Sequence, residues 1–336
     1  GEDALVDQLA HRSAVRRREA QWELLKRGAN PKLAEGLFGL MKDGSQPLFG
    51  RVAAIFTFKQ LFGPKGNTYL AELLGDEAVR EFALRAIADR KGELEGVPAT
   101  WFREALRDPN PRVRLQAVIG LERLGTTEGA EEIITLASAG WEPRAKLGKD
   151  EDHRIPHACV RALARTGAWE VCLAAVADPQ RRTVALRALQ RMHRDEVVDG
   201  LARILAGAES DSALRFDVMS ALARLYHTEG EWDKKAWWGT RPDDRGPYFI
   251  VADWSGTPKV KRVLESGFGR LAKADRARML EVFAKNRIEI SKLTLGDQDP
   301  LQVALMTPVP VSYTHLTLPT KESRGSGRGW GGGGGG

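Results

Sequence analysis

Residues 108 to 125 read Asp108-Pro109-Asn110-Pro111-Arg112-Val113-Arg114-Leu115-Gln116-Ala117-Val118-Ile119-Gly120-Leu121-Glu122-Arg123-Leu124-Gly125, and this stretch decides the fold class of the 336-residue chain. Apolar residues recur at helical spacing, at Val113, Ala117, Leu121 and Leu124. Asp108 can cap the helix by accepting from its free amides. A proline at 109 or 111 suits the first turn, and Gly125 is a typical helix terminator. The stretch therefore predicts an amphipathic helix with both ends marked.

Related patterns recur at residues 76–89, 155–167, 178–192 and 213–225, and earlier helices are expected at 14–27 and 48–62. These intervals resemble HEAT repeats, in which two antiparallel helices form each unit and neighbouring units bury each other's faces. We predict an all-α fold, a HEAT-like α-solenoid of about six or seven helix pairs. The resemblance implies that Asp108 and Arg114 belong to a polar ladder between adjacent repeats, which is a structural role.

The composition describes a mixed surface. The chain has 51 basic and 45 acidic residues and a formal net charge of +6. The last 27 residues hold Lys321, Arg324 and Arg328 against Glu322, so that 6 − 2 leaves +4 for residues 1–309. A nucleic-acid surface would need these charges clustered on one face, so no nucleic-acid partner is predicted. No stretch approaches the roughly 18 consecutive apolar residues of a membrane helix, so no membrane segment is predicted.

The cysteines and histidines do not predict a cofactor or metal site. Cys159 and Cys172 both lie in apolar helical patterns and are interpreted as small buried side chains, although one bond between them stays open. His153 and His157 are four residues apart with Cys159 close by. Pro156 makes a shared helix face doubtful, and no further ligand follows at metal-site spacing. Arg16-Arg17-Arg18 is interpreted as a solvated helix face.

Two segments interrupt the repeat pattern. Residues 1–228 form the predicted repeats, with an insertion at 138–154 that contains Trp141 and a run of charges. Residues 229–257 form a long aromatic loop, and residues 258–295 form terminal helices of the array. Insertions in solenoids tend to lie on one face and often carry contacts.

The aromatic loop is the strongest candidate interaction site. It holds four tryptophans within 29 residues, and its candidate residues are Trp237, Trp238, Arg241, Asp243, Tyr248 and Trp254. The favoured interpretation is that the rings cover an exposed end of the repeat core, with Arg241 paired to Asp243 or Asp244. A binding surface is the other interpretation, because tryptophan, tyrosine and arginine dominate the energetics of protein interfaces. The two interpretations are compatible.

The segment Trp237-Trp238-Gly239-Thr240-Arg241-Pro242-Asp243, with Gly246-Pro247-Tyr248 and Trp254, resembles a loop of the PVC-type haem-binding CxxCH proteins. The opening helix, residues 11–28, is similar to the segment that leaves the propeller in that group. Members look like a sugar-dehydrogenase-type β-propeller, a helical repeat region and a c-type cytochrome on one polypeptide. The resemblance covers residues 10–290 and implies a periplasmic or cell-envelope location.

This resemblance implies a non-catalytic scaffold that connects propeller and cytochrome domains, with neighbouring domains of the same polypeptide as its expected partners. No Cys-x-x-Cys-His occurs here, so the resemblance assigns haem c to a downstream domain and no cofactor to this chain. No Walker loop, dinucleotide-binding glycine motif, nucleophile elbow or zincin pair occurs. Whether the parent protein is a dehydrogenase-like oxidoreductase stays open.

Two other functions are compatible with the sequence. A free-standing HEAT-repeat protein could bind a protein partner on its concave face. A HEAT-like DNA glycosylase would use Trp238, Asp243 and Arg241, but these residues lie in one loop and are not spread over several repeats.

Residues 310–336 are expected to be non-native. The run Pro310-Val311-Ser312-Tyr313-Thr314-His315-Leu316-Thr317-Leu318-Pro319-Thr320 resembles a translated sequencing adapter, and polyglycine follows at 331–336. A segment of this kind carries no information about the fold. If it is translated, it is expected to be disordered. The chain also begins at Gly1 without a methionine, so both ends are expected to be truncated.

Overall fold

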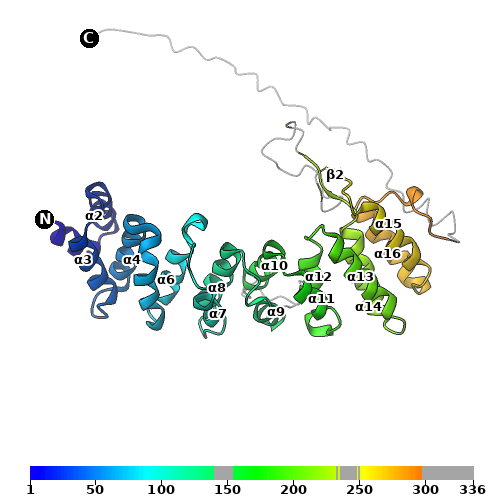
Figure 1. The fold of residues 1–336 in the computed structure, drawn as a ribbon, viewed down its shortest axis with the longest axis horizontal. Coiled ribbons are helices and arrows are strands. Elements are labelled where there is room, and N and C mark those ends of the chain that lie inside the picture. The colour runs from blue at the N-terminus through cyan, green and yellow to red at the C-terminus, as the bar shows by residue number, and fades with distance from the viewer. Residues whose placement is uncertain (140–153, 232–233, 235–247, 249, 297–336) are drawn as a thin grey trace, which may run out of the picture.

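The fold is an all-α helical-repeat solenoid, as the sequence predicts. A computed structural model describes residues 1–139, 154–231, 234, 248 and 250–296. Successive helices follow a gently curved path from α1 to α16 (Figure 1). The α-helices are α1 (Glu2–Leu9), α2 (Ala14–Arg27), α3 (Pro31–Lys42), α4 (Leu48–Phe62), α5 (Asn67–Ala71), α6 (Arg80–Ile87), α7 (Ala99–Ala105), α8 (Pro111–Leu124), α9 (Ala130–Ala139), α10 (Arg154–Thr166), α11 (Trp169–Ala175), α12 (Pro179–Leu189), α13 (Asp195–Gly207), α14 (Ser212–Arg224), α15 (Thr257–Phe268) and α16 (Lys273–Lys285).

Short elements join these helices. The 3₁₀ helices are η1 (Gly63–Gly66), η2 (Glu72–Gly75), η3 (Lys91–Glu93) and η6 (Ile290–Lys292). Two short strands, β1 (Thr228–Glu229) and β2 (Val251–Ala252), pair antiparallel, with Thr228 opposite Ala252 and Glu229 opposite Val251. The strands therefore bring the two ends of the aromatic loop together.

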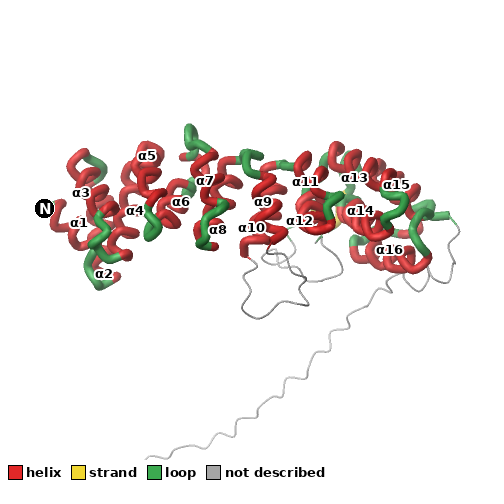
Figure 2. The backbone as a smooth tube through the Cα atoms, turned by 90° about the horizontal axis from the view of Figure 1, so that it is seen from below, coloured by secondary structure: helices red, strands yellow, loops and turns green. Residues whose placement is uncertain are grey.

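The helices lie in two layers. Consecutive helices pack in pairs from α1–α2 to α13–α14, and α15 and α16 both pack against α14. The even-numbered helices contact one another in order from α2 to α16 and form one continuous layer. The odd-numbered helices lie largely in a second row, which Figure 2 separates from the first. Each unit thus buries its neighbour's apolar face, as repeat architectures do.

Helix α8 shows how the deciding stretch folds. Val113, Ala117 and Leu121 are fully buried, Pro111 occupies the first turn, and Gly125 ends the helix in the left-handed conformation at φ 72°. The predicted cap is wrong, because Asn110 caps α8 by accepting from the Arg112 amide at 2.9 Å. The helix begins at Pro111, so the Asp108 carboxylate is too far back and accepts from the Asn110 amide at 2.8 Å instead.

The two cysteines are free. Cys159 on α10 and Cys172 on α11 are both buried, and burial raises the pKa of each thiol to about 12. They pack as small apolar side chains and stay protonated at neutral pH. The disulfide that the sequence left open is not formed in this structure.

No described helix is long and apolar enough to cross a membrane. The predicted insertion at 138–154 and the tail at 310–336 fall almost wholly outside the described residues.

Candidate functional site

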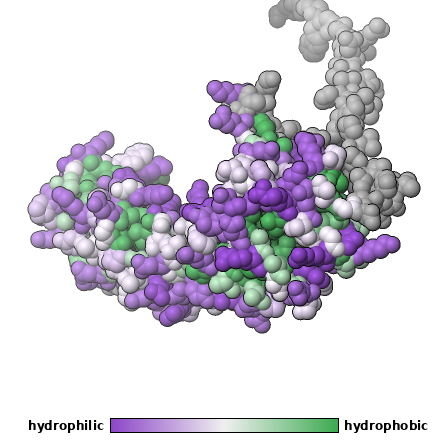
Figure 3. All heavy atoms as spheres, turned by 45° about the vertical axis from the view of Figure 1, so that its right-hand side comes forward, coloured by the Kyte–Doolittle hydropathy of each residue, from purple (hydrophilic) through white to green (hydrophobic). Residues whose placement is uncertain are grey.

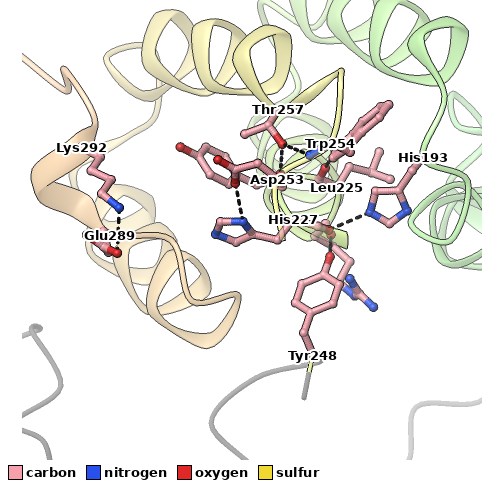
Figure 4. A network of polar contacts seen from close by, with 11 residues as sticks. His193, Leu225, His227, Tyr248, Asp253, Trp254, Thr257, Glu289 and Lys292 are labelled. Carbon is pink, nitrogen blue, oxygen red and sulfur yellow. Dashed lines mark hydrogen bonds and ion pairs between the residues drawn. The ribbon is translucent and has the colours of Figure 1, made fainter. Parts of the chain in front are cut away.

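The base of the aromatic loop is built on the C-terminal end of α14. A helix leaves its last backbone carbonyls without partners inside the helix. Here the carbonyl of Arg224, the last residue of α14, and those of the three residues that follow it, Leu225, Tyr226 and His227, each accept a hydrogen bond from a different side chain (Figure 4). The donors, which we call the α14 cap, are Tyr248, Trp254, Thr257 and His193.

Three members of the α14 cap come from the returning side of the aromatic loop. The Tyr248 hydroxyl donates to the Arg224 carbonyl. Trp254 Nε1 donates to the Leu225 carbonyl at 2.8 Å, and Thr257 Oγ1 donates to the Tyr226 carbonyl at 2.7 Å. The Thr257 hydroxyl also accepts from the Trp254 amide at 3.0 Å, so the two residues hold each other in place.

The fourth member comes from the preceding repeat. His193 lies between α12 and α13, and its Nε2 is 2.7 Å from the His227 carbonyl. A carbonyl can only accept, so Nε2 carries the hydrogen in this contact. The ring also meets Trp254 edge to face, with centroids 5.4 Å apart. Burial lowers the pKa of His193, and the nearby Arg224 adds to this effect.

Tyr248 is almost completely buried beneath an arginine. Its side chain is among the largest fully buried ones in the described part of the chain. The Arg224 guanidinium lies 3.9 Å from the ring centroid, a cation–π distance. Burial of a large aromatic ring with its hydroxyl hydrogen-bonded is a favourable arrangement, because the polar tip keeps a partner.

Next to the α14 cap is an open, charged pocket of about 290 Å³. His227 Nδ1 lies 3.1 Å from the Asp253 carboxylate at its edge, and Lys292 pairs with Glu289 at 2.9 Å on the far side. Burial raises the pKa of the Tyr226 hydroxyl in the wall of the pocket, and Asp253 adds to this rise. The charges alternate in sign, so the pocket has no strong preference for anions or cations. Its lining is Tyr226, His227, Val251, Asp253, Arg287, Glu289 and Lys292.

The structure brings two of the predicted loop residues together. Tyr248 and Trp254 lie on the same helix end, whereas Trp237, Trp238, Arg241 and Asp243 lie outside the described residues. The sequence did not single out His193 or Thr257. His193 is 34 residues from its partner, and no local pattern marks that contact. Thr257 follows Gly256, where an added Cβ would lie 2.2 Å from the Trp254 ring. The glycine that this tight turn requires is the feature of the sequence that could have drawn attention to Thr257.

Asp108 and Arg114 lie away from the loop, in the turn before α8 and on α8 itself. The Asp108 carboxylate is 3.0 Å from Arg80 of the preceding even helix, α6. The equivalent contacts Arg51–Asp76 and Arg182–Asp211 connect other neighbouring units. Arg114 instead donates within its own unit, to the carbonyls of Asp108 at 2.7 Å and Pro109 at 2.9 Å.

In the part of the chain that the structure covers, no group of three or more His, Cys, Asp or Glu side chains is placed to hold a metal ion.

No protein-family model matches the chain, and no curated protein matches it. Among solved structures, the chain is similar to two crystal structures of engineered proteins. The first is 16% identical at a TM-score of 0.36 and covers 91% of this chain and 87% of the other. The second is 16% identical at a TM-score of 0.25 and covers 91% of this chain and 97% of the other. At these scores neither likeness bears on the function of the chain.

Proposed function

We propose that the chain is a non-catalytic helical-repeat scaffold that binds other protein domains, with the aromatic loop as a docking surface. In the fuller form of the proposal, the scaffold connects a dehydrogenase-like propeller to a c-type cytochrome domain of the same polypeptide. The fuller form rests on the resemblance of the loop and the opening helix in sequence. The coarser form rests on the α14 cap.

The α14 cap carries the proposal because it gives the loop a fixed base. A long loop in a repeat array is functional or disordered in most proteins. Here Tyr248, Trp254 and Thr257 hold the returning end, and the Gly230 amide donates to the Ile250 carbonyl at 2.8 Å where the loop leaves. Because the two ends are fixed, docking at the base of the loop needs less ordering than docking of an unanchored segment would, which favours affinity.

The residue types of the loop suit a protein partner. Trp237, Trp238 and Arg241 are the types that contribute most at the centre of interfaces. The loop leaves the array after α14, which packs against α12, α15 and α16, so a partner bound at the loop lies close to the C-terminal units of the repeats.

The first experiment reads the native gene outward from codons 1 and 308. We expect sequence that encodes a propeller domain upstream and sequence that encodes a Cys-x-x-Cys-His motif downstream. Stop codons close to codon 308, with neither flank, would favour the free-standing protein-binding module.

The second experiment uses the full protein that this gene encodes. Cross-links between residues 229–257 and a neighbouring domain are mapped by mass spectrometry in the wild type and in the double variant Trp237→Ala/Trp238→Ala. The double variant is expected to lose these cross-links while its helical circular dichroism is unchanged. Trp22→Ala, at the opposite end of the array, is the matched control and keeps them. Retention of the cross-links in the double variant contradicts the proposal.

A further inference from the structure

The pocket beside the α14 cap has two walls that come from different parts of the chain. One wall, which we call the ribbon wall, lies at the base of the aromatic loop and consists of His227, Val251 and Asp253. The other, the α16 wall, follows helix α16 and consists of Arg287, Glu289 and Lys292. Figure 4 shows Glu289 and Lys292 on one side of this space and Asp253 and His227 on the other.

The two walls carry opposite net charge. In the ribbon wall, Asp253 contributes −1 and His227 is counted as neutral. In the α16 wall, Arg287 and Lys292 stand against Glu289, so 2 − 1 leaves +1. The pairs His227–Asp253, at 3.1 Å, and Glu289–Lys292, at 2.9 Å, each lie within one wall. The pocket is therefore neutral as a whole but has an anionic side and a cationic side.

The size and polarity of the pocket limit what it can hold. Its volume of about 290 Å³ lies just below the range of about 300–1,000 Å³ that small-molecule pockets span, so it suits a ligand of amino-acid size. Among the described residues that line it, Val251 alone is aliphatic. Hydrophilic residues also predominate on the face of the molecule drawn in Figure 3. Recognition in this pocket therefore depends on charge and hydrogen bonding more than on apolar contact.

Arg287 holds its place in the α16 wall at a cost to the backbone. Helix α16 closes with the Arg287 amide donating to the Ala284 carbonyl at 3.0 Å and the Ile288 amide donating to the Phe283 carbonyl at 3.0 Å. In this type of helix end, the residue at the position of Arg287 is usually glycine, because its φ is positive. Arg287 adopts φ 59° there. Strained residues of this kind cluster at functional sites, so an arginine in a glycine's position, with its side chain in the wall of a pocket, marks a binding site.

We propose that this pocket binds a small zwitterion, a free α-amino acid, between its two walls. The ammonium group of the ligand pairs with the Asp253 carboxylate, and the ligand's carboxylate pairs with the Arg287 guanidinium, supported by Lys292 in the same wall. The Tyr226 hydroxyl lines the pocket as well. Burial raises its pKa, so it stays protonated at neutral pH and can donate a hydrogen bond.

Other small ligands match the lining less well. A simple anion or a simple cation would pair with only one wall, and a neutral polyol would pair with neither charge. The residues that line the pocket all lie outside 231–247, so the proposal does not depend on the docking function proposed for the aromatic loop.

Thermal-shift measurements on the full chain with each of the standard L-amino acids are the first test. A ligand that binds the folded protein raises its melting temperature, and we expect a rise with at least one amino acid. The affinity of the best one is then measured by titration calorimetry beside two derivatives. The N-acetyl derivative lacks the ammonium and the α-amide lacks the carboxylate. Each is expected to bind roughly tenfold more weakly, or worse, because one wall loses its charged partner.

Variants of the two walls assign the roles of the charges. Asp253→Asn keeps an oxygen that can accept from His227 but loses the charge. It is expected to weaken binding of the amino acid by about tenfold and to leave the affinity for the N-acetyl derivative unchanged. Arg287→Gly removes the cation and relieves the strained φ, so it is expected to weaken binding without lowering the melting temperature of the ligand-free protein. Arg287→Lys keeps the charge and is expected to bind more tightly than Arg287→Gly.

Lys234→Gly is the matched control. Lys234 is a second non-glycine residue with a positive φ, of 60°, and it does not line the pocket. The same replacement there also removes a cation and relieves strain, and it is expected to leave binding unchanged. A melting temperature that no amino acid raises overturns the proposal, as does equal binding of the amino acid, its two derivatives and glycerol. Equal binding by Arg287→Gly and the wild type also overturns it.

Discussion

At the scale of single residues, the α14 cap solves a problem of hydrogen bonding. Buried backbone carbonyls without a partner cost free energy, and the end of α14 is covered by the returning loop. Each of the four carbonyls accepts from a side chain that is between 24 and 34 residues away. These four hydrogen bonds fix the returning end of the loop and His193 against the end of α14, where the repeat is interrupted.

Replacement of Thr257 tests the contribution of one of these bonds. Thr257→Val has a similar shape but leaves the Tyr226 carbonyl and the Trp254 amide without the hydroxyl. We expect a loss of about 1–3 kcal/mol in the free energy of unfolding, measured by urea titration. Thr257→Ser keeps the hydroxyl and serves as the control, with a smaller loss. A Thr257→Val variant as stable as the wild type would show that these hydrogen bonds contribute no net stability.

His193 makes part of the stability depend on pH. Burial lowers its pKa in the folded state, so the unfolded chain binds the proton more readily. The stability that neutral His193 contributes is complete above the unfolded pKa of about 6.5. It is lost as the pH falls below that value towards the lowered folded pKa.

The variant His193→Gln isolates this effect. Glutamine can donate an amide hydrogen to the His227 carbonyl but does not titrate. In thermal melts from pH 8 to pH 5, a range of about three pH units that spans the unfolded pKa, the wild type is expected to lose more stability than the variant as the pH falls. Parallel losses in the two proteins would contradict the expectation.

At the scale of elements, close contacts between helices depend on glycines at particular positions. Gly120 lies inside α8, and a Cβ there would be 2.1 Å from Phe102 Cδ1 of α7. Gly200 of α13 is in the same situation against Leu173 of α11, at 2.2 Å. These glycines weaken their own helices, since glycine costs up to about 1 kcal/mol relative to alanine, but they let α8 approach α7 and α13 approach α11.

Gly120→Ala sets helix propensity against packing. Because Phe102 is fully buried and cannot swing into solvent, we expect overpacking to dominate, with a net destabilisation of about 1–3 kcal/mol in chemical unfolding. Gly39→Ala in α3 is the control, because no atom lies within 4 Å of its added Cβ. It is expected to be neutral or slightly stabilising. Similar effects at the two positions would mean that α7 and α8 can separate at little cost.

At the scale of the whole molecule, one continuous core runs along the array. Buried residues from Val6 near the N-terminus to Leu295 belong to a single cluster. Salt bridges such as Arg51–Asp76 and Arg80–Asp108 join successive units of the even layer. Each described repeat is therefore expected to be stabilised by its contacts with the repeats next to it, as in other linear repeat proteins.

Replacement of residues 231–247 with a short Gly-Ser linker tests whether the loop serves the array or a partner. All four members of the α14 cap lie outside this range, so the melting temperature of the array is expected to stay within a few degrees of the wild type, a shift equivalent to less than about 1 kcal/mol. Tyr248→Ala, which removes a buried ring, is expected to lower the melting temperature by considerably more. A large drop caused by the linker would mean that the replaced residues stabilise the repeats directly.

The sequence by itself determined the fold class and the regular features of the units. Val113, Ala117 and Leu121 show the helical period, and Pro111 and Gly125 mark where α8 begins and ends. These signals depend on residues within one or two turns of each other, so they can be read along the chain. The repeat pattern located the even-numbered helices from α2 to α14, including the eight-residue α6. The odd-numbered helices from α1 to α13 were expected only as the second members of HEAT-like pairs and were given no bounds, because the repeated pattern marks one helix of each pair.

Only the tertiary structure decided which side chains meet at the end of α14. Tyr248 and Trp254 were chosen from the sequence as candidate loop residues, but their acceptors are backbone carbonyls, which every residue has. His193 reaches the same helix end from another repeat. Local patterns determine elements, whereas contacts between distant segments depend on how the elements pack.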